Sequence, residues 1–288
     1  MLDVIKAQYD KMSKGQKKIA DYISENMERA AFMTAMKLAE AAAVSESTVV
    51  RFATMLGYDG YPEFQQAMAD ELQGRLVSPK KANTNEFREN RSELLRRVLV
   101  SDAQNIVDTI GMVDSDVFDQ AVELVSNARK ICVVGIRTCA PLADYLTYYL
   151  RMMRDDVVSV TTTNISEIYE QLSWLKKEDV VIGISFPRYS LRTLRAMDYA
   201  NHQGARIISV TDSKYSPMNM YSSVCLWAKT DMITIADSLV APMSTINALV
   251  IGVYLKNEEQ IRKRLEALEE SWNAFQTYDR DEMSDIGE

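Results

Sequence analysis

From residue 130 onward the sequence alternates short apolar runs with longer segments of helical periodicity. The apolar runs are rich in Val and Ile, as buried strands are, and the segments between them are long enough to form crossover helices. Strands joined by such crossovers pair in parallel, because each crossover returns the chain to the same edge of the sheet. The pattern therefore predicts a three-layer α/β domain with a five-stranded parallel sheet. The predicted strands are 131–135, 157–162, 179–186, 205–212 and 223–228, and the predicted helices of this part are 140–153, 165–175, 190–203 and 241–255.

The first 75 residues have a different character, because apolar positions recur at helical spacing and no proline precedes Pro62. Ser13 with Gln16 three residues later forms a capping-box pattern, which predicts a helix from Lys14 to about Asn26. These residues predict a small all-helical domain in front of the sheet domain. The predicted fold class is thus α + α/β.

The 288 residues are enough for two domains. Residues 76–86 mix Gly, Ser, Pro, Lys and Asn without periodicity and are predicted to be a linker. The second domain is expected to span 87–278, including two helices near 86–111 and 115–128 that belong to this domain or to a dimer contact. A helix from Glu258 is expected to fray into a disordered tail over 279–288.

Composition excludes several classes of protein. His202 is the only histidine, and Cys132, Cys139 and Cys225 lack metal-site or disulfide spacing, which argues against a zinc enzyme, a histidine triad or a bound cofactor. The net charge of -8 means that any DNA binding must come from a local patch. No long apolar run indicates a membrane span, and the N-terminus lacks signal-peptide character, so a cytoplasmic protein without membrane partners is expected.

The segment 34–56 has the pattern of two short helices joined by a tight turn. Thr34 is placed to cap the first helix, Ser45 to cap the second, and Gly57 to end it. An ordinary pair of packed helices would have the same spacing, but short donors and an arginine at the start of the second helix favour a helix-turn-helix that enters the DNA major groove. The predicted DNA-contacting residues are Lys14, Lys17, Lys18, Thr34, Lys37, Ser45, Ser47, Thr48 and Arg51.

The stretch LAEAAAVSESTVVRFATMLGYDGYPEFQQAM resembles the N-terminal domain of the RpiR family of bacterial transcriptional regulators. In that family such a domain is coupled to a sugar isomerase (SIS) domain. Ala43 stands where the family often has glycine in the turn, so a left-handed conformation there would cost on the order of 1 kcal/mol. Thr54 and Met55 replace residues that are commonly basic, so the resemblance implies that DNA affinity depends more on Arg51 and the N-terminal lysines.

Three predicted strands end in polar loops, at 135–139, 185–193 and 211–217. In a parallel sheet these ends share one edge, where backbone amides at helix starts can hold an anion. Any one of the loops alone is more typical of ordinary helix capping, but three at one edge indicate a ligand site. The predicted ligand-binding residues are Gly135, Arg137, Thr138, Cys139, Ser185, Arg188, Tyr189, Ser190 and Thr193.

Over about 115–255 these loops resemble those of SIS domains, whose second loop reads Ser-x-Ser-Gly-x-Thr. Aligned on Ser185, the second serine falls on Pro187, the glycine on Arg188 and the threonine on Ser190. A variant RpiR subgroup shares the FPRYS loop and an arginine after the first glycine, here Arg137. The resemblance implies that the two arginines hold a phosphate or carboxylate, with the nearby hydroxyls completing the site.

Together these features predict a transcriptional regulator of sugar metabolism genes that binds a double-stranded DNA operator as a homodimer or tetramer and responds to a sugar phosphate or sugar acid. Catalysis is not expected, because Tyr189 stands where active SIS isomerases often place an acid, although Asp212 and Glu167 lie near the loops. Two alternatives stay open: a sugar-phosphate isomerase, and a metabolic sensor that does not bind DNA, since basic and acidic residues nearly balance over 1–80.

Overall fold

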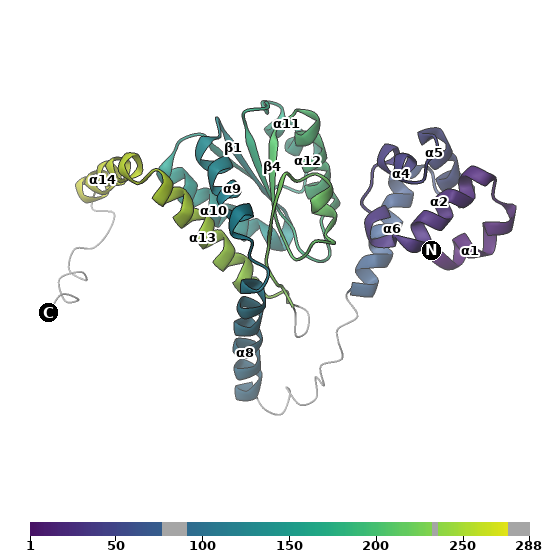
Figure 1. Cartoon of the computed structure of the whole chain (residues 1–288), viewed down its shortest axis with the longest axis horizontal. Helices are drawn as coiled ribbons and strands as arrows, with labels where there is room; N and C mark the ends of the chain where they lie inside the picture. The colour runs from purple at the N-terminus through teal and green to yellow at the C-terminus, as the bar shows by residue number, and fades with distance from the viewer. Residues whose placement is uncertain (77–90, 232–235, 276–288) are drawn as a thin grey trace.

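The computed structural model describes residues 1–76, 91–231 and 236–275 (Figure 1). Nearly all of the predicted linker, and the whole of the predicted tail 279–288, lie outside these described residues. The described chain forms a helical N-terminal domain and a C-terminal domain built around a parallel sheet, as the sequence predicts.

The N-terminal domain is entirely helical in its described part. The predicted capping box is present: Ser13 Oγ accepts a hydrogen bond from Gln16 N, and the Gln16 side chain accepts one from Ser13 N. Phe52 and Phe64 are fully buried at the centre, with their ring centroids 5.7 Å apart. Its elements are α1 (Leu2–Gln8), η1 (Tyr9–Lys11), α2 (Lys14–Glu25), α3 (Met27–Ala30), α4 (Ala35–Ala41), α5 (Glu46–Met55) and α6 (Tyr61–Leu76).

Helices α4 and α5 form the predicted helix-turn-helix pair. Ala43 in the turn has a φ of 51°, the left-handed conformation in which a Cβ is unfavourable. Gly57 (φ 95°) follows α5, as expected for a glycine at a helix end. Ser45 occupies the N-cap position, but its hydroxyl contacts the hydroxyls of Ser47 and Thr48 rather than a backbone N–H of the described helix.

The sheet contains five parallel strands in the order β2-β1-β3-β4-β5. Each predicted strand is present, and four of them are one or two residues shorter than predicted at one or both ends. The bounds are β1 (Ile131–Gly135), β2 (Val157–Val160), β3 (Val180–Ile184), β4 (Arg206–Thr211) and β5 (Val224–Trp227).

Helices cover both faces of the sheet (Figure 1). Gly135 at the end of β1 is needed for this packing, because a Cβ there would lie 2.6 Å from Cys139 O and 2.8 Å from Ala143 Cβ. One face packs against α9 (Ser115–Asn127), α10 (Ala140–Met153) and α13 (Val240–Lys256), and the other against α11 (Ile165–Leu172), α12 (Leu191–His202) and η3 (Pro217–Met220).

Two further helices extend from the sheet domain (Figure 1). They are α8 (Arg91–Ile110), which precedes α9, and α14 (Glu258–Ala274), which follows α13. None of the helices in the described part of the chain is long and apolar enough to cross a membrane.

Candidate functional site

The strand order reverses at β1, which lies between β2 and β3. The chain leaves the ends of β1 and β3 toward opposite faces of the sheet, and a crevice opens between the two loops; ligands of open α/β sheets bind at such a point. Here the crevice is a cavity of about 280 Å³, hereafter the anion cavity. Its lining residues are Ile136, Arg137, Thr138, Cys139, Ser185, Phe186, Pro187, Arg188 and Ser190.

Two arginines in the left-handed conformation flank the anion cavity. Arg137 has a φ of 62° and Arg188 a φ of 75°. Arg188 therefore occupies a backbone conformation suited to glycine, at the position where the SIS loop has glycine. A guanidinium is a bidentate donor to phosphate and carboxylate groups. Two cations and two left-handed backbone positions therefore meet at this cavity.

Asp237 is a functional candidate that the sequence analysis missed. Its carboxylate Oδ2 accepts a hydrogen bond from Arg188 Nη2 at 2.7 Å, and its side chain is only 9% exposed. The two residues lie 49 positions apart, and Asp237 precedes α13 rather than following a strand, so no local pattern marks it. An anionic ligand that uses Arg188 must compete with this carboxylate.

The hydroxyls at the end of β3 close the loop on itself. Ser185 is buried, and its Oγ accepts a hydrogen bond from Ser190 N at 3.3 Å. Ser190 Oγ in turn accepts one from Thr193 N at 3.4 Å and so caps α12. Both serines line the anion cavity. A ligand bound there can therefore replace these internal hydrogen bonds with hydrogen bonds of its own.

Cys139 lines the same cavity without offering a nucleophile. Burial raises the pKa of its thiol to about 11, and the charge of Asp237 acts in the same direction. At neutral pH the thiol is protonated, since thiolate forms only near the pKa. Cys139 therefore contributes surface and a weak donor to the cavity.

Three of the predicted ligand-binding residues lie outside the cavity lining. Gly135 packs against α10 as described above. Thr193 is fully buried in the first turn of α12. Tyr189 turns away from the cavity: its hydroxyl donates to Asp212 Oδ1 at 2.6 Å, and its ring contacts Phe32.

The third predicted loop, 211–217, contacts the end of β3 outside the anion cavity. Thr211 Oγ1 donates to Ser185 O at 2.8 Å and exchanges a 2.7 Å hydrogen bond with Ser216 Oγ. Both hydroxyls are buried, so this loop fixes the end of β3 rather than lining the cavity.

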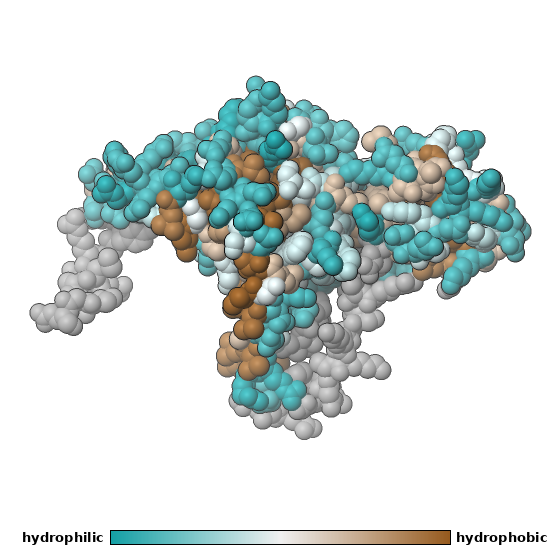
Figure 2. Space-filling model, viewed as in Figure 1, coloured by the Kyte–Doolittle hydropathy of each residue, from teal (hydrophilic) through white to brown (hydrophobic). Residues whose placement is uncertain are grey.

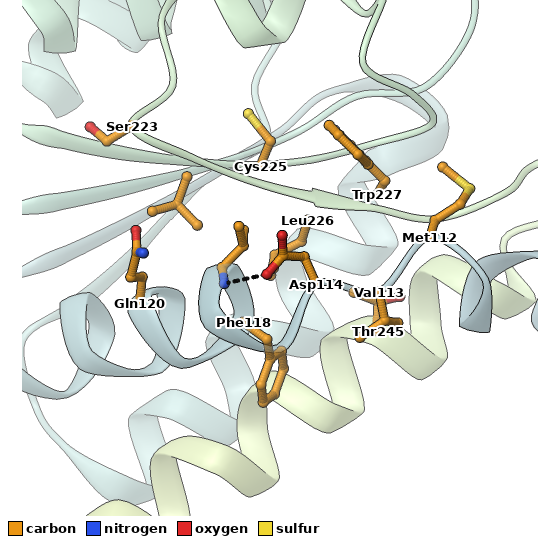
Figure 3. Close-up of a pocket in the computed structure, with 12 residues that line it drawn as sticks. Met112, Val113, Asp114, Phe118, Gln120, Ser223, Cys225, Leu226, Trp227 and Thr245 are labelled. Atoms are coloured by element: carbon orange, nitrogen blue, oxygen red, sulfur yellow. Dashed lines mark hydrogen bonds between the residues drawn. The ribbon is translucent and has the colours of Figure 1, made fainter.

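A second cavity of about 280 Å³ lies beside the edge strand β5 (Figure 3). Its walls are mainly apolar, with Phe118, Leu226 and Trp227 among them. The carboxylate of Asp114 is already used, because it accepts hydrogen bonds from Asp116 N and Val117 N at the start of α9. This cavity lacks the convergent cationic groups of the anion cavity and is not the better site for a charged ligand.

A third cavity, of about 460 Å³, opens near the amino ends of the strands and contains Arg154 and Arg264. Both guanidinium groups serve the fold: Arg154 donates to Val125 O and Ala128 O, and Arg264 donates to Asp155 and to Met152 O. Within the residues that the structure describes, no cluster of three or more His, Cys, Asp or Glu side chains could hold a metal ion.

The predicted DNA-contacting residues separate into two groups. Ser45, Ser47 and Arg51 are exposed at the N-terminal half of α5, and Thr48 beside them is half-buried. Arg51 is oriented by hydrogen bonds to Ser47 O at 3.1 Å and Ser47 Oγ at 3.3 Å. This is the end of a recognition helix that would enter the major groove.

The other predicted residues have different surroundings. Lys14 is exposed on α2, Lys17 lies 5.0 Å from the Tyr9 ring centroid, and Lys18 donates to Ala43 O at 3.4 Å. Thr34 caps α4 by accepting from Lys37 N. Lys37 itself points to the sheet domain, where its Nζ lies 3.4 Å from Asp198 Oδ1.

Comparison with known families assigns both domains. Residues 1–75 match the model of the helix-turn-helix domain of the rpiR family, and residues 124–252 match the SIS domain. The chain thus carries an rpiR-family helix-turn-helix domain followed by a SIS domain. Together the two models match well over half of the chain, and they agree with the resemblances seen in the sequence.

The relatives with this architecture include helix-turn-helix-type transcriptional regulators. HexR of Pseudomonas aeruginosa is 24% identical over 275 residues, covering 94% of this chain and 95% of HexR. A regulator of Haemophilus influenzae is 26% identical over 228 residues, covering 78% of each chain. The alignment with HexR spans nearly the whole of both chains, so the similarity extends over both domains of this protein.

Two solved structures share the fold. The sugar isomerase domain of an RpiR transcription factor from Sphaerobacter thermophilus matches with a TM-score of 0.60 and 25% identity, over 62% of this chain and 99% of that one. The Vibrio vulnificus NanR protein, solved with ManNAc-6P bound, matches with a TM-score of 0.59 and 20% identity, over 95% of this chain and 98% of NanR.

Proposed function

We propose that this protein is a DNA-binding transcriptional regulator of sugar metabolism genes whose SIS domain binds a phosphorylated or acidic sugar. The observation that carries the proposal is the anion cavity at the β1–β3 switch point, with Arg137 and Arg188 at its rim, in a chain that also presents a helix-turn-helix. That NanR, of the same fold, binds a phosphosugar supports this ligand class. A regulator of this kind acts where the chromosome is, in the cytoplasm.

The ligand requires an anionic group and hydroxyls. The arginines and the amides at the start of α12 suit a phosphate or carboxylate. Asp237 and the serine hydroxyls suit sugar hydroxyls, which donate to carboxylates and exchange hydrogen bonds with Ser185 and Ser190. A cavity of about 280 Å³ suits a ligand of monosaccharide size rather than an oligosaccharide.

The test of the function uses the intact protein with labelled DNA from upstream of its own gene. We expect specific retention of this DNA in a gel shift, and a phosphorylated sugar or sugar acid that raises the melting temperature and changes DNA retention. Failure to bind the upstream DNA, while an effector still raises the melting temperature, would favour a sensor that acts without DNA.

A sugar-phosphate isomerase is the competing function. Proton transfer between adjacent carbons needs a general base at the substrate. All three nearby carboxylates accept hydrogen bonds from other side chains. Asp212 accepts from Tyr189, Glu167 in the first turn of α11 accepts from Thr162, and Asp237 accepts from Arg188. These contacts favour binding without turnover. Conversion of a sugar phosphate by the purified protein would reverse this assignment.

We further propose that the regulator is a homodimer that uses α8. Figure 2 shows apolar atoms along this helix, and Leu95, Leu99, Val107 and Ile110 at spacings near whole helical turns are each more than half exposed. Such a stripe on an otherwise polar protein suits burial against a second copy. We expect Leu99→Glu to lower the mass measured by light scattering, whereas Gln104→Glu, on an exposed part of the same helix away from the stripe, leaves it unchanged. Equal masses for both variants would exclude this face.

A further inference from the structure

The helical domain is seated on the sheet domain beside the anion cavity. The Phe32 ring, between α3 and α4, meets the Tyr189 ring edge to face, with centroids 5.6 Å apart and planes at 90°. Tyr221 donates its hydroxyl hydrogen to Phe32 O at 3.4 Å. Phe32 is only 3% exposed, so this contact removes a large aromatic side chain from water.

Charged and polar contacts surround this aromatic pair. Lys37 Nζ lies 3.5 Å from the Tyr221 ring centroid and 3.4 Å from Asp198 Oδ1. On α6, Gln65 donates to Met33 O at 2.7 Å and accepts a longer bond of 3.5 Å from Arg195. We call the sheet-domain side, made of Tyr189, Arg195, Asp198 and Tyr221, the seat.

The same loop forms both the anion cavity and the seat. Arg188 and Ser190 line the cavity, and Tyr189 between them points the other way, to Asp212 and Phe32. The hydrogen bond from Ser190 N to Ser185 Oγ fixes the conformation of this loop. Because Arg188 has a φ of 75°, this loop also carries backbone strain next to Tyr189.

We propose that Tyr189 couples the state of the anion cavity to the placement of the DNA-binding domain. This inference rests on the proposed function, since it assigns the route by which an effector would reach the DNA-binding domain. An anionic ligand that accepts the hydrogen bond from Ser190 N breaks the bond between Ser190 N and Ser185 Oγ, and the loop then shifts. After this shift Tyr189 cannot keep both its hydrogen bond to Asp212 and its ring contact with Phe32. A ligand regulates only through such a difference between two arrangements.

The seat sets the orientation of the DNA-binding domain rather than blocking it. Ser47 and Arg51 remain exposed while Phe32 and Lys37 are engaged. Two recognition helices in a dimer must match the spacing of their half-sites, so a change in seating alters DNA affinity without covering α5. A coupling of the usual strength would change DNA affinity about 5- to 150-fold.

Hydrogen–deuterium exchange of the full chain tests the coupling without DNA or effector. The observed peptide spans Phe32 to Leu38, and the cavity is perturbed by Ser185→Ala, which removes the acceptor of the Ser190 N–H. We expect this variant to speed exchange of the peptide several-fold. The matched control is Ser244→Ala on α13, whose hydroxyl bonds only the preceding turn in the described structure, and it should change nothing.

The decisive comparison repeats Ser185→Ala in a Tyr189→Ala background. There the peptide already exchanges faster, and the second substitution should add no further change. The coupling is overturned if Ser185→Ala leaves the exchange rate of the Phe32–Leu38 peptide unchanged. It is also overturned if Ser185→Ala speeds this exchange equally in both backgrounds. Exchange of the β1 peptide serves to show that each variant remains folded.

Inorganic phosphate gives the second arm of the experiment. Phosphate that protects the 185–190 peptide must also alter exchange at Phe32–Leu38; protection of the first without change in the second overturns the coupling. Phosphate that protects neither peptide counts against the anion cavity, and hence the proposed function, while the variants still decide the coupling.

Discussion

Asp237 Oδ2 lies 2.7 Å from Arg188 Nη2, so the cation best placed for an anionic ligand is already neutralised by the protein's own carboxylate. The pair is mostly shielded from water, with the Asp237 side chain 9% and the Arg188 side chain 30% exposed. The ligand therefore binds in exchange for an internal ion pair, which makes the affinity for an anion depend on Asp237 as well as on Arg188.

The first prediction follows from this pair. Arg188→Ala should weaken binding of an effector found by thermal-shift screening about tenfold or more, because a charge-assisted hydrogen bond is lost. Asp237→Asn should tighten binding several-fold, because the competing charge is gone while the amide oxygen can still accept a hydrogen bond from a sugar hydroxyl. Isothermal calorimetry measures both, with the exposed Asp119→Asn on α9 as control. Equal affinities in all four proteins would show that the anion binds elsewhere.

The second prediction concerns the recognition helix. Arg51→Ala should weaken binding to the upstream DNA and, if its contact is to a phosphate, lower the salt dependence of binding by about one counterion. The control is Arg262→Ala on α14, an exposed arginine paired with Glu266. Fluorescence anisotropy over a range of salt concentrations gives the affinity and the slope. Identical slopes and affinities for Arg51→Ala and the wild type would remove this residue from the interface.

The third prediction tests the packing that shapes the anion cavity. Gly135→Ala should destabilise the sheet domain by about 1–3 kcal/mol, because the new methyl group would overlap Cys139 O and Ala143 Cβ. Urea unfolding followed by tryptophan fluorescence measures this, since all three tryptophans lie after residue 130. Gly60→Ala is the control, because the nearest atom to its Cβ is 3.7 Å away. A neutral Gly135→Ala would contradict the close approach of α10.

The fourth prediction uses the turn of the helix-turn-helix. Ala43→Gly should stabilise the helical domain by about 0.5–1 kcal/mol, because relief of the left-handed strain exceeds the added entropy of the unfolded chain. Ala41→Gly, inside α4, should destabilise it by up to about 1 kcal/mol. Thermal unfolding followed by circular dichroism compares the two. Stability changes of the same sign would mean that Ala43 is not strained.

Local patterns in the sequence were sufficient for most of the fold. The capping box at Ser13 and the bounds of α10 agree with the structure, because caps and helical periodicity act within a few residues. The five parallel strands are also confirmed, since apolar runs between helices allow few other arrangements. Carboxyl ends of strands were predicted too long at 161–162, 185–186, 212 and 228, because the apolar run does not show where pairing with the neighbouring strand stops.

The candidate site was only partly predictable. Six of the nine proposed ligand residues line one cavity, since the ends of parallel strands must share an edge. The direction in which each side chain points was not encoded locally. Tyr189 follows Arg188 directly, yet its ring faces the other domain and its hydroxyl meets Asp212.

The sequence by itself determined the two domains, the parallel sheet and the loops that gather at its carboxyl edge. Only the tertiary structure decided that Asp237 neutralises Arg188 and that Lys37 faces Asp198 instead of lying free on a helix. These pairs join residues 49 and more positions apart, so they depend on how finished elements pack. Periodicity and capping report on neighbours along the chain, whereas charge pairing between elements exists only once the chain has folded.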